Sequence, residues 1–155
     1  MVARVIAFLL LVPVVAAQEK KDEPKLTKEE KAFIDLTNAE RKKAELGPVT
    51  PNAKLMAAAK GHATNMAKQD KLDHVLDEKK PQDRVLDAGY KFAATAENIA
   101  WNQKTPKEVI GVWMNSEIHK KNILGEDFTE IGVAVVRNAK GEPYWVQVFG
   151  APLKE

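Results

Sequence analysis

Apolar residues recur along this chain with two different spacings. Over residues 51–71 they return every three or four positions, which is the spacing of one face of an α-helix. The positions of this stripe are Leu55, Ala59, His62 and Met66. After Asp127 they return at every second position, which is the spacing of a β-strand. The strand-like positions are Ile131, Val133 and Val135, followed by Tyr144, Val146 and Val148.

Capping signals bracket the early helices. Thr27 and Glu30 form a capping box that opens a helix ending near Leu46, because Gly47 and Pro48 follow it. Thr50 and Pro51 give a second start signal, which predicts a helix from Pro51 to about Lys71.

Two further helices are predicted in the second half of the chain. A short one covers residues 81–88 and is closed by Gly89. Thr105, Pro106 and Glu108 open the other, which runs through Trp113 and on to Ser116 or beyond. Residues 90–101 are too irregular to assign.

The strand-like region predicts a β-hairpin over residues 131–149, with its turn at residues 138–141. Both faces of the hairpin are largely apolar, so helices are expected to cover both sides. Helices early and strands late then indicate an α+β fold, a three-layer α-β-α sandwich with a central antiparallel sheet.

The N-terminus has the pattern of a secretory signal peptide. Residues 1–17 carry a single charge, Arg4, followed by an apolar run and the small residues Ala16 and Ala17. The run is too short for a membrane span, and Pro13 interrupts it. We therefore expect a signal peptide over 1–17, a flexible leader over 18–26 and one domain over 27–155, secreted to the extracellular space or the periplasm, with no transmembrane segment after cleavage.

Composition narrows the possible partners. The chain has 24 basic and 22 acidic side chains, and its lysines alternate with acids along helices. A nucleic-acid partner is not expected, because no basic stripe or surplus is present. No cysteine occurs, so the mature domain must be held together without disulfides. We expect a monomer.

Three short motifs supply candidate chemistry. His74 follows Leu72-Asp73, His119 closes the segment that begins at Trp113, and Glu97 lies between them in Ala-Glu-Asn-Ile-Ala. Imidazole binds divalent metals and exchanges protons near neutral pH, and a carboxylate would complete such a polar site.

These motifs resemble the CAP superfamily, in its bacterial branch of SCP-like extracellular proteins, the group that includes cysteine-rich secretory proteins, antigen 5 and pathogenesis-related proteins. The resemblance spans residues 28–152, in order. It rests on Asn38-Ala39-Glu40-Arg41, His62-Ala63, Asp73-His74, the Ala-Glu-Asn-Ile-Ala segment, Trp113-x-x-Ser116-x-x-His119 with Asn122-Ile123-Leu124, the segment 128–133 and the closing segment 144–150.

The resemblance implies an α-β-α sandwich with a cleft that holds two histidines and two acidic or polar residues. Carried over to this chain, the cleft contains His74, Glu97 and His119, with Ser116 as the fourth member. Glu117 is the alternative. If the helix continues through His119, as Ile118 favours, Ser116 lies about 60° from His119 and Glu117 about 200° from it, so we rank Ser116 first.

Several functions remain open for this cleft. His74 and His119 are candidate ligands for zinc or another divalent cation, although zinc sites usually have three protein ligands and only Glu97 could be the third. Glu97 is a candidate catalytic base acting on water, or it simply orients one imidazole. Ser116 could serve as a nucleophile with His119 as its base, but no oxyanion donor is evident.

We expect foremost a binding module for a small molecule, lipid or cell-surface component. The alternatives are a metal-assisted hydrolase that uses Glu97, and an interaction protein whose cleft is vestigial. No enzymatic activity is assigned. His62 is expected to be a satisfied core residue outside the site, because it lies on an apolar helix face.

Overall fold

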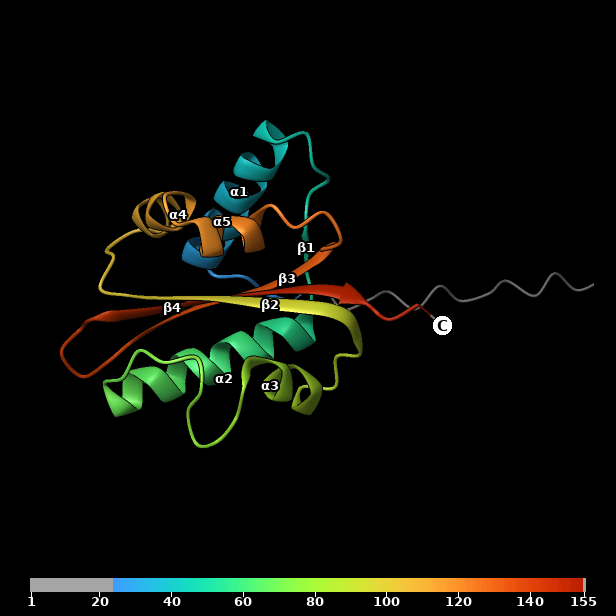
Figure 1. Ribbon diagram of the computed structural model, residues 1–155. Helices are drawn as coiled ribbons and strands as arrows, with labels where there is room; N and C mark the ends of the chain where they lie inside the picture. The colour runs from blue at the N-terminus through green and yellow to red at the C-terminus, as the bar shows by residue number, and fades with distance from the viewer. Residues whose placement is uncertain (1–23, 155) are drawn as a thin grey trace, which may run out of the picture.

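The computed structural model describes residues 24–154, which form a sheet between two layers of helices (Figure 1). The predicted α+β sandwich is therefore confirmed. The helices are α1 (Lys28–Lys43), α2 (Ala53–Gln69), α3 (Pro81–Asp87), α4 (Pro106–Met114) and α5 (Glu117–Ile123). The strands are β1 (Thr50–Pro51), β2 (Phe92–Trp101), β3 (Glu130–Arg137) and β4 (Pro143–Pro152). Helices α1, α4 and α5 cover one face, and α2 and α3 cover the other.

The sheet is built around the predicted hairpin. Strands β3 and β4 pair in antiparallel fashion, and β2 pairs with the other side of β4, so that the strand order is β1-β3-β4-β2. The turn contains Gly141, whose φ of 80° is one that glycine adopts without strain. The short β1 pairs with β3 in parallel, so the sheet is not wholly antiparallel.

The two faces of the hairpin belong to two separate cores. On β4, Val146 and Val148 pack in the core that faces α2, whereas Trp145 and Phe149 pack in the core that faces α1 and α4. All four are at most 2% exposed. The expectation that helices cover both faces is confirmed, and it follows from the period-two alternation of apolar residues.

The predicted helix starts were partly correct. The capping box is present: the Glu30 amide donates to Thr27 Oγ1 at 3.1 Å, and the Thr27 amide donates to Glu30 Oε2 at 2.8 Å. The second start was misplaced, because the cap of α2 is Asn52, whose side chain accepts from the amide of Lys54. Thr50 and Pro51 form β1 instead of opening the helix.

The segment left unassigned by the sequence pattern contains the strand β2. It lies at one edge of the sheet, which would leave backbone groups unpaired. Side chains from the adjacent helical layer meet two of them: Asn122 Nδ2 donates to the Glu97 carbonyl, and Trp113 Nε1 donates to the Ile99 carbonyl, each at 3.3 Å. Part of this edge is therefore closed by the fold itself.

The predicted signal peptide over 1–17 and most of the leader over 18–26 lie outside the described residues. Of the leader, Leu26 packs against the core that faces α1. Within residues 24–154, none of the helices combines the length and the apolar character needed to cross a membrane.

Candidate functional site

Glu97 is the centre of a buried polar cluster on β2. Its side chain is only 2% exposed. Its Oε1 lies 2.9 Å from His74 Nδ1, and both of its carboxylate oxygens accept from Arg84 Nη2, at 2.9 Å and 2.7 Å. A buried carboxylate needs such partners because leaving water is costly for a charge. We call Glu97, His74 and Arg84 the Glu97 cluster.

Arg84 was not recognised in the sequence. It lies on α3, and besides Glu97 it donates through Nη1 to the carbonyls of His74 at 3.0 Å and Lys79 at 2.8 Å. The guanidinium thus holds the loop that carries His74 against β2. The only signal in the sequence was general, because arginine is the residue that most often contacts both oxygens of a carboxylate.

The contact with Glu97 fixes the proton on His74. A carboxylate only accepts hydrogen bonds, so Nδ1 of His74 carries a hydrogen and donates it. In the neutral ring, Nε2 then keeps its lone pair. The His74 side chain is 46% exposed, so ligands in solution can reach this ring. The orienting role predicted for Glu97 matches this geometry.

His119 and Ser116 lie on the opposite helical layer, at the junction of α4 and α5. The prediction of a helix continuing through His119 is wrong: α4 ends at Met114, and Ser116 stands at the N-cap of the next helix. Ser116 Oγ lies 2.9 Å from His119 Nδ1. Glu117 is exposed, and no residue in the described part of the chain is recorded in contact with its carboxylate.

The environment of His119 favours its neutral form. Burial lowers its pKa, and the charge of His74 lowers it further. The ring stacks on Trp113, with centroids 6.0 Å apart and planes inclined by 27°.

A chain of amides fixes α5 against β2. Asn122 Nδ2 donates to Asn98 Oδ1 at 2.8 Å, and Asn98 Nδ2 donates to Gln147 Oε1 and to the His119 carbonyl, at 3.1 Å and 3.2 Å. Asn98 and Gln147 are fully buried. Because Asn98 follows Glu97 on the strand, this network sets the position of His119 relative to the Glu97 cluster.

His62 differs from its predicted role as a satisfied core residue. It is fully buried on α2, as predicted, but neither ring nitrogen makes a well-formed hydrogen bond, although a backbone contact with Asp73 raises its pKa. Its Nε2 lies 3.8 Å from Glu97 Oε1. Burial lowers its pKa to about 4, because desolvation outweighs the attraction of Glu97. A neutral imidazole therefore forms the inner wall of the Glu97 cluster.

A permanent metal site does not fit these residues. Within residues 24–154, no three His, Cys, Asp or Glu side chains are grouped so as to hold a metal ion. Of the candidate ligands, Glu97 has both oxygens engaged by Arg84 and His74. Only the two imidazoles of His74 and His119 remain available, which is fewer than zinc usually requires.

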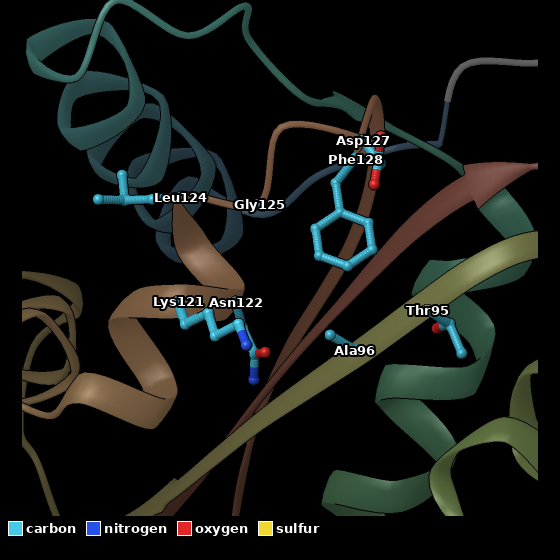
Figure 2. Close-up of a pocket in the computed structure, with 8 residues that line it drawn as sticks. All are labelled: Thr95, Ala96, Lys121, Asn122, Leu124, Gly125, Asp127 and Phe128. Carbon is cyan, nitrogen blue, oxygen red and sulfur yellow. The ribbon is translucent and has the colours of Figure 1, made fainter.

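A hollow of about 530 Å³ opens beside this site, between β2, α5 and the loop that leads to β3 (Figure 2). We call it the Phe128 pocket. Its lining is Thr95, Ala96, Lys121, Asn122, Leu124, Gly125, Asp127 and Phe128. In Figure 2, Lys121 and Asn122 extend from α5, and the Phe128 ring points between them and β2. No pattern of residues in the sequence indicated this hollow.

The chain belongs to the CAP family, described as the cysteine-rich secretory protein family, whose sequence pattern matches residues 34–149. The match holds although the chain has no cysteine. The resemblance of the motifs to this family is thereby confirmed.

Two curated Bacillus subtilis proteins are similar to the chain. The uncharacterized protein YkwD is 40% identical over 121 residues, which are 77% of this chain and 46% of YkwD. The uncharacterized membrane protein YlbC is 31% identical over 135 residues, which are 86% of this chain and 38% of YlbC. The chain thus spans less than half the length of either relative.

Solved structures of bacterial relatives have the same fold. An outer surface protein of Borrelia burgdorferi superposes with a TM-score of 0.77 at 25% identity, over 83% of this chain and 97% of that chain. An extracellular protein with an SCP domain from Bacillus anthracis gives a TM-score of 0.73 at 26% identity, over 82% of this chain and 44% of that chain.

Proposed function

We propose that this protein is an extracellular binding module, in which His74 and His119 contact a small polar ligand beside the edge of β2. The observation that carries the proposal is that Arg84 and His74 already engage both oxygens of Glu97. The extracellular location is supported by the signal-peptide pattern of residues 1–17 and by the descriptions of the Borrelia and Bacillus anthracis proteins.

The contacts of Glu97 favour binding over hydrolysis. A general base must approach a water molecule within about 3 Å along a free lone pair. The Glu97 side chain is 2% exposed, and both of its oxygens already accept hydrogen bonds from Arg84 and His74, so neither is open to a water molecule. Its contact with His74 instead gives that ring a fixed orientation, which suits recognition.

The exposed nitrogen of His74 suggests the kind of ligand. With Nδ1 donating to Glu97, Nε2 of the neutral ring accepts hydrogen bonds, so the ligand group that meets it is a hydroxyl or an amide N–H. A ligand that carries hydroxyl and amide groups, such as an acetylated sugar, matches this acceptor.

Chemical-shift mapping by NMR tests the binding proposal. We would titrate N-acetylglucosamine and, separately, acetamide into the protein labelled with ¹⁵N. Saturable shifts of the His74 and His119 ring nitrogens, reduced in His74→Phe and retained in the surface control Lys120→Gln, are the expected result. Absence of any shift at either ring with these hydroxyl and amide donors would contradict the proposal.

A weak divalent-metal site on His74 and His119 is the second candidate. It is supported by the contact between His74 and Glu97, since a carboxylate often orients an imidazole that binds metal. Calorimetric titration of zinc, then calcium and magnesium, tests it. Saturable binding that is lost in both His74→Ala and His119→Ala would establish the site. Absent binding, or binding unchanged in both variants, would remove this candidate.

The hydrolase alternative has its own discriminating variant. If Glu97 activated water, Glu97→Gln would abolish turnover while the fold remained intact. Under the binding proposal, the unmodified protein shows no turnover of the ligand it binds. If neither binding nor turnover were found, an interaction protein with a vestigial cleft would be the remaining interpretation.

A further inference from the structure

The outer edge of β2 has an open backbone position at Thr95. Even-numbered residues of this strand bond to β4, as the amide of Asn102 does to the Pro143 carbonyl at 2.8 Å. The backbone groups of odd-numbered residues point away from β4. This is seen at Glu97 and Ile99, whose carbonyls accept from helix side chains. The register continues unbroken from Thr95 to Trp101, so the backbone of Thr95 also points out of the sheet.

Thr95 differs from Glu97 and Ile99 in having no cap. Asn122 and Trp113 close the edge at those two positions. No residue of the described chain, 24–154, is recorded donating to the Thr95 carbonyl. The open position coincides with the Phe128 pocket, which Thr95 lines. An unpaired strand edge beside a hollow is the arrangement that binds extended peptides by adding a strand.

Two exposed side chains of opposite charge line the Phe128 pocket. Lys121 lies on α5 and Asp127 on the loop, both are exposed, and neither forms an ion pair with another residue of the described chain. Ala96 and Phe128 give the hollow an apolar lining. Its volume, about 530 Å³, lies within the usual range for small-ligand pockets.

The wall of the pocket is held in place before any ligand binds. Arg41, which is 1% exposed, donates to the carbonyls of Gly125 at 2.8 Å and Phe128 at 3.0 Å. The Phe128 ring stacks on Phe149, with centroids 5.4 Å apart. A wall fixed in this way lowers the ordering cost of binding.

We propose that the Phe128 pocket and the open edge at Thr95 form a second binding site, for a short extended peptide with free ends and one apolar side chain. The peptide backbone pairs with Thr95, and its apolar side chain packs against Phe128. Its carboxylate meets Lys121 and its ammonium meets Asp127. This site does not depend on the function proposed for the two histidines.

NMR titration with the tripeptide Ala-Leu-Ala tests the proposal. We expect saturable shifts at the amides of Thr95, Lys121 and Phe128. Lys121→Gln and Asp127→Asn should each weaken binding about two- to fivefold, the usual effect of losing an exposed ion pair. Acetylating and amidating the peptide ends should weaken it similarly. The tripeptide with N-methylleucine, which lacks the central backbone donor, should bind more weakly than the parent.

Two matched variants distinguish binding in the Phe128 pocket from a general charge effect and from binding at the histidines. Lys120→Gln removes the neighbouring exposed charge of α5, which does not line the pocket, and should leave the affinity unchanged. His74→Ala should also leave it unchanged, because the peptide does not contact the histidine site. The proposal is overturned if Ala-Leu-Ala gives no saturable shift, or if Lys121→Gln and Lys120→Gln have equal effects.

Discussion

Arg84 and Glu97 form an ion pair that is almost entirely shielded from water. One guanidinium nitrogen lies 2.9 Å and 2.7 Å from the two carboxylate oxygens, and the side chains are 11% and 2% exposed. The pair joins α3 to the edge strand β2. Glu97 also contacts His74, so the orientation of this exposed ring depends on Arg84, which itself contacts the backbone of His74.

Removal of Arg84 should therefore be strongly destabilising. Arg84→Ala leaves the carboxylate of Glu97 buried without its cation, which typically costs about 3–5 kcal/mol. Urea unfolding, followed by far-UV circular dichroism, measures the change. The matched control is Lys79→Ala, which breaks an exposed pair with Asp87 and should cost less than about 1 kcal/mol. Equal losses of unfolding free energy in the two variants would show that the buried pair contributes no more to stability than the exposed pair.

A double replacement separates the pair from its surroundings. Arg84→Met combined with Glu97→Leu removes both charges at once and leaves neither unpaired. Such replacements are often neutral or stabilising, so the double variant should recover most of the loss seen in Arg84→Ala. If it were as unstable as Arg84→Ala, the bonds from Arg84 to the carbonyls of His74 and Lys79 would be the larger contribution.

Burial of His62 predicts a loss of stability in weak acid. Its pKa falls from 6.5 to about 4 because a charged imidazole would lie in a site without solvent. Between these values the unfolded chain binds a proton that the folded chain does not. The free energy of unfolding therefore falls as the pH decreases from 6.5 towards 4, by up to about 3 kcal/mol.

Urea unfolding at several pH values across this window measures the effect, and His62→Leu should flatten the dependence. His119, whose pKa is also lowered, contributes in the same direction and should leave a residual slope in that variant. An unchanged slope in His62→Leu would mean that other groups govern acid stability.

The sequence predicted the layers and the hairpin because their signal is local. Alternation over residues 131–149 and the capping box at Thr27 depend only on near neighbours. Strand β2 was missed because its face towards α5 carries Asn98 and its face towards α3 carries Glu97, so neither face reads as apolar. Both polar groups are paired by residues distant in sequence.

The candidate site shows the same limit. The motifs singled out His74, Glu97, Ser116 and His119, and the structure places Glu97 against His74 and Ser116 against His119. Arg84 has no local signal, since its role depends on α3 packing beside β2. The lack of a well-formed hydrogen bond at His62 could not be predicted either, because an apolar helix face indicates burial and says nothing about partners.

Ser116 should control the ring of His119 more than the stability of α5. Although it occupies the N-cap position, its side chain makes no cap bond and instead contacts His119 Nδ1. Ser116→Ala should cost about 1 kcal/mol, the usual value of one hydrogen bond. The ¹⁵N shifts of the His119 ring, which report its tautomer, should change while those of His74 do not. Unchanged His119 shifts would show that Ser116 does not set the tautomer.

Gly132 on β3 lies directly against the backbone of α2 at Leu55. A Cβ atom at this position would lie 2.1 Å from the backbone carbonyl group of Leu55, and backbone atoms cannot move aside as a flexible side chain can. We expect Gly132→Ala to destabilise the protein by about 3 kcal/mol or more, the upper end of the usual cost of overpacking.

Gly111 in α4 is the matched control, since a Cβ there meets no atom within 4 Å. Gly111→Ala should stabilise the protein by up to about 1 kcal/mol, because alanine favours helix more than glycine does. Thermal unfolding of the two variants should thus shift in opposite directions, and a shift in the same direction would show that α2 and β3 can separate at little cost.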